Sequence, residues 1–322
     1  MPVRVKDVAH VAIKDIDPQK GVDAKMLDRL VNRSILRATS ALETSVPNFS
    51  NFQRQHLGSM FESLGYTHRT IRHLLKLGSS NPISVDALVV GRLQLEALYS
   101  LCLMLEDPNY INIYLKDSWR KTYVRYLLEK EECKNLPRFS DFLNKSALPL
   151  LKALKQLAGV NDDELATVEM EELSVPLPTR CTVKQIGQFP TPARIIAKVR
   201  SSSRKRMLKR LYPEYQLLSS YVHGTSTSFH MFKSLFNPRS KYRNLFPTGK
   251  IDVMFQKEVG EAAIYIDYIC LVQSCTELVE IYPNDVDLRA TLSDAWAPLV
   301  EGSLLGRAIW DIRSRTLLGV VS

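Results

Sequence analysis

The sequence predicts an all-α fold, a multi-helix bundle with long buried central helices and an irregular proline-rich connector. Apolar residues recur at helical spacing through most of the 322 residues, and no strand-like alternation persists. Prolines and glycines fall between the periodic stretches, where they end helices or form turns. The apolar content of 45% is sufficient for a packed core, so a disordered chain is not expected.

The N-terminal third of the chain is expected to contribute an arm and three helices. Residues 1–20 are predicted to form the arm, as a short strand or an irregular segment. An amphipathic helix begins at Asp23, and a second follows the turn at 46–50 and ends at the Gly- and Pro-containing segment 78–82. The third helix, from about 85 to 106, is apolar on nearly all sides and is therefore expected to be buried.

The middle of the chain is predicted to hold two helices, an acidic segment and the connector. One helix runs through INIYLKDSWRKTYVRYLLEKEE until Pro137, and the next covers 139–157 and ends at Gly159. The acidic stretch 161–172 is predicted to be a short surface helix. The VPLPTRCTVKQIGQFPTP segment after it is rich in proline and is expected to be an extended connector that can cover a cleft.

A basic helix and a short polar helix are predicted next. Thr191 and the proline after it are suited to cap and start a helix through ARIIAKVRSSSRKRMLKRL, interrupted at 201–203. The stretch 212–224, YPEYQLLSSYVHG, is predicted to be a separate helix of about three turns. Pro213 suits its first position, and Gly224 suits the left-handed residue that follows a helix.

The C-terminal part is expected to complete the bundle. Residues 225–249 are predicted to be a loop with one or two helical turns, and the periodic stretch 252–282 is expected to pack lengthwise on helix 85–106. The tail offers one or two short helices that dock on the core or form a homodimer contact. The expected parts are an arm at 1–20, a bundle at 21–282 with a basic segment at 173–251, and a tail at 283–322.

The charge distribution points to a polyanionic partner. The net charge is +9, yet 173–251 holds fifteen Lys and Arg residues against a single acid, Glu214, which gives that segment a charge of +14. Nucleic acid is the first candidate and a phosphorylated metabolite the second. In an intramolecular alternative, the acidic run 162–172 docks on the basic segment. The predicted RNA- or DNA-binding residues are Arg194, Lys198, Arg200, Arg204, Lys205, Arg206, Lys209 and Arg210.

A polar face is predicted on helix 212–224. Tyr215, Ser219 and His223 stand at i, i+4 and i+8, so their side chains lie on one side, with the ends about 12 Å apart. Because the intervening residues are apolar, these polar groups need hydrogen-bond partners. His223 lies near the carbonyl end of the helix, which favours the imidazolium. It is either a core histidine bonded to a carboxylate or carbonyl, or a functional group.

Arg92 and Glu96 are two ionic residues in the most apolar helix. Their i, i+4 spacing allows them to pair, and neither is stable alone in such surroundings. The pair either holds helices together or belongs to a polar centre in which Glu96 is the partner of His223. The candidate catalytic residues of such a centre are His223, Arg92, Glu96, Tyr215 and Ser219.

The sequence lacks the motifs that usually identify several classes of enzyme. The sequence has no Walker loop, no dinucleotide-binding glycine motif, no H-E-x-x-H and no G-x-S-x-G. The five cysteines form no C-x-x-C pair and are predicted to be reduced core residues, and no metal or cofactor is expected. Without a signal peptide or a long uncharged apolar run, a cytoplasmic protein with no membrane contact is expected. The segment 68–73, HRTIRH, is predicted to be a solvated basic face.

The motifs R-x-x-x-E, at Arg92 and Glu96, and Y-x-x-x-S-x-x-x-H-G, from Tyr215 onwards, support a resemblance. Together they resemble an uncharacterised family of all-helical bacterial proteins, known as a domain of unknown function and associated with mobile and defence-related loci. The resemblance covers roughly 55–282. It implies a helical fold and the pairing of the two motifs in space, but it supplies no reaction.

A looser resemblance is to the HEPN class of helical ribonucleases, in which a dimer brings together Arg and His from an R-x(4 to 6)-H motif. This would imply metal-independent RNA cleavage. The sequence departs from the pattern, because His223 has no Arg at that spacing ahead of it, and only Arg4 and His10, in the arm, match.

The favoured function is a nucleic-acid-associated protein of a prokaryotic defence or mobile-element system, which binds RNA or DNA through the basic segment around a buried polar centre. One alternative is a HEPN-like ribonuclease toxin that uses His223 as general acid or base, with Arg92 stabilising phosphate charge. The other is a non-catalytic sensor or adaptor that binds an acidic protein partner.

Overall fold

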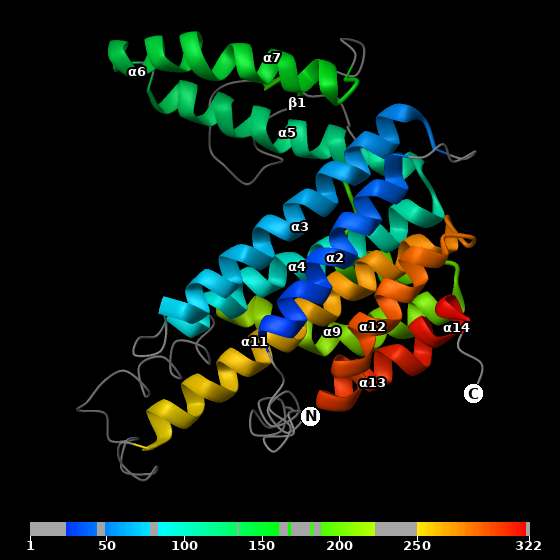
Figure 1. Cartoon of the computed structure of the whole chain (residues 1–322). Coiled ribbons are helices and arrows are strands. Elements are labelled where there is room, and N and C mark those ends of the chain that lie inside the picture. The colour runs from blue at the N-terminus through cyan, green and yellow to red at the C-terminus, as the bar shows by residue number, and fades with distance from the viewer. Residues whose placement is uncertain are drawn as a thin grey trace, which may run out of the picture. The chain divides into compact units, whose positions relative to one another are not determined.

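The computed structural model describes residues 24–43, 49–77, 83–133, 135–160, 167–168, 181–182, 188–222 and 250–319. These residues fold almost entirely into helices, so the predicted all-α class is confirmed (Figure 1). The chain divides into two compact units, one formed by 1–106 with 192–322 and the other by 107–191. The predicted arm and the loop 225–249 lie outside the described residues.

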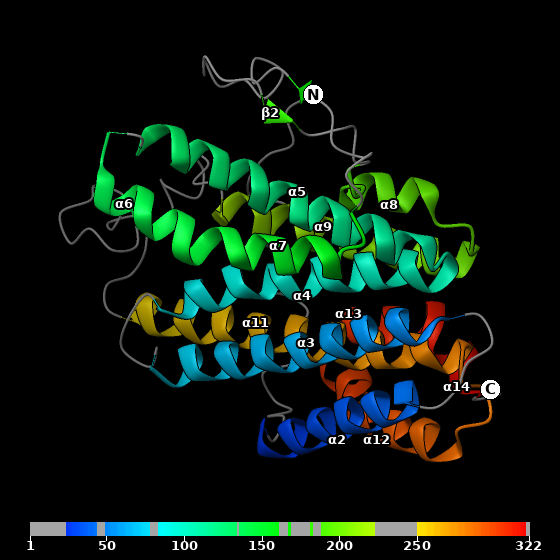
Figure 2. The same ribbon diagram turned by 90° about the horizontal axis from the view of Figure 1, so that it is seen from above.

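The larger unit is built around α4 (Ile83–Glu106). The helices α2 (Ala24–Glu43) and α3 (Asn51–Leu77) precede it, and both have the amphipathic pattern that the sequence predicts. Figure 2 shows α3, α4 and α11 (Lys250–Glu277) side by side, and α4 packs most extensively against α11 and α3. The prediction that the long C-terminal helix packs lengthwise on the most apolar helix is therefore confirmed.

One helix among the described residues is long and apolar enough to cross a bilayer. It is the Asp86–Glu106 part of α4, with a mean hydropathy of 1.5, and 61% of its most apolar stretch is buried inside the fold. A buried central helix of a bundle has the same composition as a membrane span.

The basic helices differ from the prediction at Pro213. The chain forms α8 (Pro192–Lys198) and, after a break, α9 (Ser202–Val222), which runs straight through Pro213. The expected separate helix starting at Pro213 was wrong. A proline removes one backbone donor within a helix, but the flanking residues Leu211 and Leu218 are buried, and their packing outweighs that loss.

The C-terminal tail belongs to the larger unit. It forms α12 (Val286–Gly302), α13 (Leu304–Ile309), a π-helical turn at Trp310–Ser314 and α14 (Arg315–Leu318). A 3-10 turn at Leu278–Glu280 leads into it from α11. The indole of Trp296 is fully buried and donates from Nε1 to Thr276 Oγ1 at 2.9 Å. The alternative in which the tail docks on the core is the one observed, and the chain has no unit boundary at 283.

The smaller unit is a helical hairpin with a short strand pair. Its elements are α5 (Asn109–Glu132), α6 (Pro137–Phe142), a π-helical turn (Leu143–Ala147), α7 (Leu148–Leu157), β1 (Thr167–Val168) and β2 (Cys181–Thr182). Trp119 Nε1 donates to Leu151 O at 3.1 Å and joins α5 to α7. Gly159 ends the hairpin with a φ of 63°, as its position predicts.

The acidic segment of this unit is not a helix at Thr167–Val168, which pairs antiparallel with Cys181–Thr182. The prediction of a surface helix over 161–172 was therefore wrong at these residues, and the remainder of that stretch lies outside the described part. Val168 is β-branched, and β-branched residues favour extended backbone over helix.

Candidate functional site

The polar centre predicted from the two motifs forms where α4 meets α9. Arg92 donates from Nε to Glu96 Oε1 at 2.9 Å, and its Nη2 lies 2.8 Å from the same oxygen. Tyr215 Oη accepts from Arg92 Nη2 at 3.4 Å and donates to Glu96 Oε1 at 3.3 Å. The two motifs are thus paired in space at these three residues, although they are more than a hundred residues apart in sequence.

Small and apolar residues set the approach of the two helices. Gly91, beside Arg92, has no side chain, and Leu218 of α9 reaches to within 4.0 Å of the place that a Cβ would occupy. Leu218 is fully buried, one turn beyond Tyr215 on the same side of α9. The packing of α9 on α4 therefore fixes the tyrosine against the Arg92–Glu96 pair.

The centre is half-buried and close to electrically neutral. The side chains of Arg92 and Glu96 are 16% and 36% exposed. Burial alone would lower the pKa of Arg92, but the charges and hydrogen bonds of Glu96 and Tyr215 raise it above its ordinary value. The guanidinium also lies 5.4 Å from the centroid of the Tyr215 ring, within the range of a cation–π contact. Arg92 is therefore a fixed cation.

The other two members of the predicted face are less defined. Ser219 lies one turn after Tyr215, and its Oγ is buried without a hydrogen-bond partner among the described residues. His223 lies outside the described residues, so its expected pairing with Glu96 stays a prediction.

The basic helices present most of their predicted cations to solvent. Lys205 and Arg210 are half-buried, and Lys205 Nζ lies 3.4 Å from Ala197 O. No ion pair within the described part of the chain engages Arg194, Arg200, Arg206 or Lys209. The exposed members of the predicted set are Arg194, Lys198, Arg200, Arg206 and Lys209.

Arg204 is the exception, and its assignment to the nucleic-acid-binding set was wrong. Its side chain is 1% exposed and lies in the core of the larger unit. Nε donates to Glu277 Oε2 and Nη1 to Glu106 Oε1, each at 2.8 Å, and Nη2 donates to Glu280. A guanidinium satisfied by three carboxylates in the interior cannot contact a nucleic acid at the surface.

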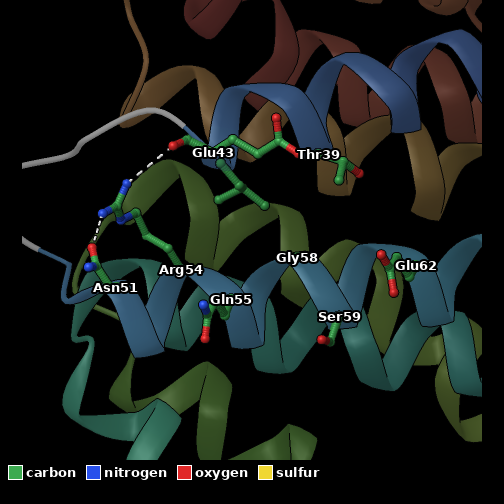
Figure 3. A pocket seen from close by; sticks show the side chains of 9 residues that line it. Thr39, Glu43, Asn51, Arg54, Gln55, Gly58, Ser59 and Glu62 are labelled. Carbon is green, nitrogen blue, oxygen red and sulfur yellow. Dashed lines mark hydrogen bonds between the residues drawn. The ribbon is translucent and has the colours of Figure 1, made fainter.

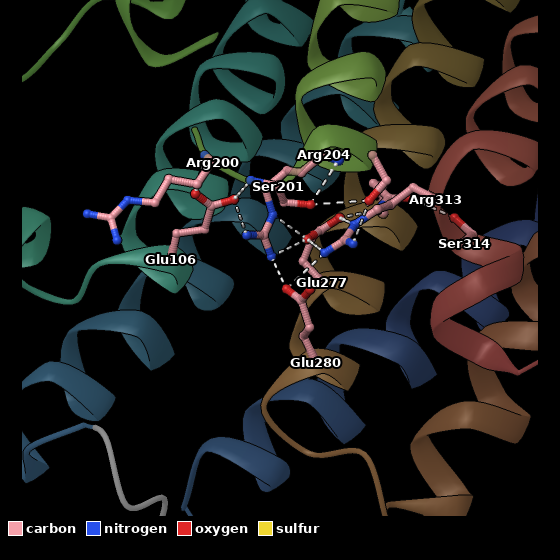
Figure 4. Close-up of polar contacts among 10 residues, drawn as sticks. Glu106, Arg200, Ser201, Arg204, Glu277, Glu280, Arg313 and Ser314 are labelled. Carbon is pink, nitrogen blue, oxygen red and sulfur yellow. Dashed lines mark hydrogen bonds and ion pairs between the residues drawn. The ribbon is translucent and has the colours of Figure 1, made fainter. Parts of the chain in front are cut away.

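Glu277 is the centre of this buried ionic cluster, as Figure 4 shows. Its carboxylate is 0% exposed and also accepts from Arg313 Nε and Nη2, both at 2.9 Å. Burial alone would raise the pKa of Glu277, but Arg204 and Arg313 hold it below its ordinary value.

The cluster ties the basic helices to the bundle. Glu106 accepts from the backbone N–H groups of Arg200, at 2.7 Å, and Ser201, at 3.1 Å. Arg313 Nη1 donates to Ser203 Oγ at 3.1 Å. The break between α8 and α9 is therefore held by side chains of α4 and of the C-terminal tail.

A second buried polar group was missed by sequence reasoning. His68, expected on a solvated face, is 2% exposed, and its Nδ1 lies 2.5 Å from Asp267 Oδ2. Its Nε2 lies 3.5 Å from Asp28 Oδ1, which also accepts from Tyr268 Oη at 2.6 Å. Burial raises the pKa of Asp267, although hydrogen bonds from His68 and Gln94 act in the opposite direction. The signal in the sequence was the position of His68 between Leu64 and Ile71 on the apolar side of α3.

A groove of about 500 Å³ lies between α2 and α3 (Figure 3). None of the predicted site residues lines it. Arg54 bridges its two walls, with Nη1 3.5 Å from Glu43 O and a hydrogen bond to Asn51. The lining residues are Thr39, Leu42, Glu43, Asn51, Arg54, Gln55, Gly58, Ser59 and Glu62.

Comparisons with protein-family models, with curated proteins and with solved structures found no match. Among the described residues, no group of three His, Cys, Asp or Glu side chains is placed to hold a metal ion.

Proposed function

We propose that this chain binds RNA or DNA through the exposed side of α8 and α9. One observation carries the proposal: five cations are exposed on α8, α9 and the break between them, and the sequence from 188 to 213 contains no acid. Such a surface attracts phosphates and releases their counterions. The loss of Arg204 from the set does not weaken the surface, because that residue anchors the helices which carry the others.

The biological setting rests on the resemblance of the two motifs to bacterial proteins of defence and mobile-element loci. We accordingly propose a role in such a system, with nucleic acid as the molecule recognised.

The test is binding of the purified protein to short single- and double-stranded RNA and DNA at two salt concentrations. The double variant Arg206→Gln, Lys209→Gln should weaken binding and make the slope of log K against log[salt] shallower by about 1.4 to 1.8, since each phosphate contact contributes about 0.7 to 0.9. Arg29→Gln, Arg33→Gln, which removes the same charge from exposed positions of α2, is the matched control. Equal effects of the two double variants would mean that only net charge matters.

The polar centre is better suited to holding the fold than to chemistry. Nε and Nη2 of Arg92 already contact Glu96 and Tyr215, so these two groups are not available to a phosphate while the centre is intact. We therefore propose a non-catalytic centre, with the HEPN-like ribonuclease as the alternative. Labelled strands that are shortened by the wild-type protein and left intact by His223→Ala would establish the nuclease.

An acidic protein partner is the remaining candidate for the basic surface. Absence of binding to every nucleic-acid probe at low salt would favour it, and the same Arg206 and Lys209 variant would then be tested against that partner.

A further inference from the structure

Three side chains on α4 and α9 form a continuous stack beside the basic surface. The rings of Tyr212 and Tyr215 are nearly parallel, with centroids 6.0 Å apart and an interplanar angle of 24°. The Arg92 guanidinium lies over the Tyr215 ring, and the Tyr99 ring is tilted against it at 6.0 Å. Tyr215 is therefore packed from several directions, whereas Tyr212 is the outer member of the stack.

Tyr212 stands in line with the cations of α9. Lys205, Lys209, Tyr212 and Gln216 follow one another at spacings of four, three and four residues, so they form one row along the helix. Lys209 and Gln216 are exposed, and Lys205 and Tyr212 are partly exposed. The row thus places a supported aromatic ring between a pair of lysines and an amide.

This combination is that of a single-strand binding surface. Proteins that bind single strands place aromatic rings, on which bases stack, beside cations that contact the backbone phosphates. In a duplex the faces of the bases are covered by their neighbours, so the Tyr212 ring could not stack on a base. Groove reading is also disfavoured, because α9 packs against α4, α8 and residues 310–314 and exposes only a stripe.

We propose that the α8–α9 surface takes single-stranded RNA or DNA, with Tyr212 as the platform for one base and Lys205 and Lys209 as contacts to the adjacent phosphates. The half-buried side chains behind it, Tyr215 and Arg92, hold the Tyr212 ring in place. Every base has a flat π-face, so this stacking contact does not depend on the base sequence. The inference rests on the proposed nucleic-acid binding and specifies its substrate class.

The experiment compares single- and double-stranded probes of the same sequence with the full chain and three variants. Wild type should prefer the single strand. Tyr212→Ala should lose roughly 5- to 150-fold in affinity for it, with an unchanged salt slope, because stacking carries no charge. Tyr212→Phe keeps the ring and should bind as wild type does.

Tyr66→Ala is the matched control, because Tyr66 is an exposed tyrosine of the same unit with Arg69 over its ring at 4.5 Å. It should bind as wild type does. As a readout that needs no variant, a single strand carrying 4-thiouridine should cross-link on irradiation to α9 at or next to Tyr212.

The outcomes separate the two proposals. If wild type binds no probe, the proposed function fails and the inference falls with it. The proposed function stands if wild type binds and the Arg206 and Lys209 variant binds more weakly. In that case the stacking inference alone is overturned by any one of three results: a preference for duplex, normal binding by Tyr212→Ala, or a cross-link that maps away from α9.

Discussion

At the scale of single residues, the ionic side chains of this protein fall into two populations that the sequence does not distinguish by type. Arg204 and Arg206 are two positions apart, yet the first is buried among carboxylates and the second is exposed. The difference is one of helical phase. Arg204 lies on the same side of α9 as Leu208 and Leu211, and this apolar row was the signal in the sequence that it faces the core.

Replacement of Glu277 tests the energetic role of the buried cluster. Glu277→Ala leaves the guanidinium groups of Arg204 and Arg313 without their shared partner, and we expect a loss of about 3 to 5 kcal/mol in the free energy of unfolding. The control is Glu129→Ala, which breaks the exposed Arg125–Glu129 pair and should cost less than about 1 kcal/mol. Urea unfolding followed by circular dichroism measures both, and equal midpoints would contradict the assigned role.

The same cluster predicts the response to acid. The folded pKa of Glu277 and that of Glu106 lie below their ordinary values. Their contribution to stability is therefore complete above the unfolded glutamate pKa, about 4.3, and is lost as the pH falls through the folded pKa. Asp267, whose pKa is raised by burial, contributes with the opposite sign.

We accordingly expect the urea midpoint to fall as the pH is lowered from 5 to about 3. Glu106→Gln keeps an oxygen that can accept from the backbone of Arg200 and Ser201 but does not titrate. Its midpoint should depend less on pH than that of wild type. A variant with the wild-type pH dependence would show that Glu106 does not contribute to the acid response.

At the scale of helices, the apolar period was the reliable guide and proline was not. The apolar pattern predicted α2, α3, α4 and α11. The apolar residues of each helix form a stripe or cover nearly all of its sides, and they are stable only when they are buried. Proline, in contrast, suggested a helix start at Pro213 that does not exist. Helix propensity describes an isolated helix and does not include the packing of the leucines that hold α9 on α4. The polar centre was foreseen at Arg92, Glu96 and Tyr215, whereas the setting of His68 depends on Asp28 and Asp267 from distant helices, which no local pattern reveals.

Two helical glycines form a matched pair at this scale. A Cβ at Gly58 of α3 would meet nothing within 4 Å, whereas one at Gly306 of α13 would lie 2.4 Å from the Leu299 carbonyl oxygen. Gly58→Ala should stabilise the protein by about 0.5 to 1 kcal/mol through helix propensity. Gly306→Ala should destabilise it by about 1 to 3 kcal/mol, since backbone must move. Thermal melts of both variants check the signs, and a destabilising Gly58→Ala would contradict the open space at that position.

At the scale of the whole molecule, chain order and spatial order differ. The expected division placed a boundary at 283, but the larger unit is made of the two ends of the chain, and 107–191 is inserted between them. Sequence reasoning followed the order of the helices and had no means of knowing that α12 packs against α2. Two ion pairs, Arg33–Asp294 and Arg37–Asp287, accompany that contact.

This organisation predicts opposite results for two deletions. Replacement of 108–190 by a flexible linker of about ten residues should leave a protein that unfolds cooperatively, because α4 packs against α8 and Glu106 still binds Arg204 of α9. Truncation after Pro283 removes less of the chain but takes away Trp296, fully buried, and Arg313, a partner of Glu277. That shorter deletion should yield a protein without a cooperative transition. Calorimetry of both proteins is decisive, since a boundary at 283 requires the reverse result.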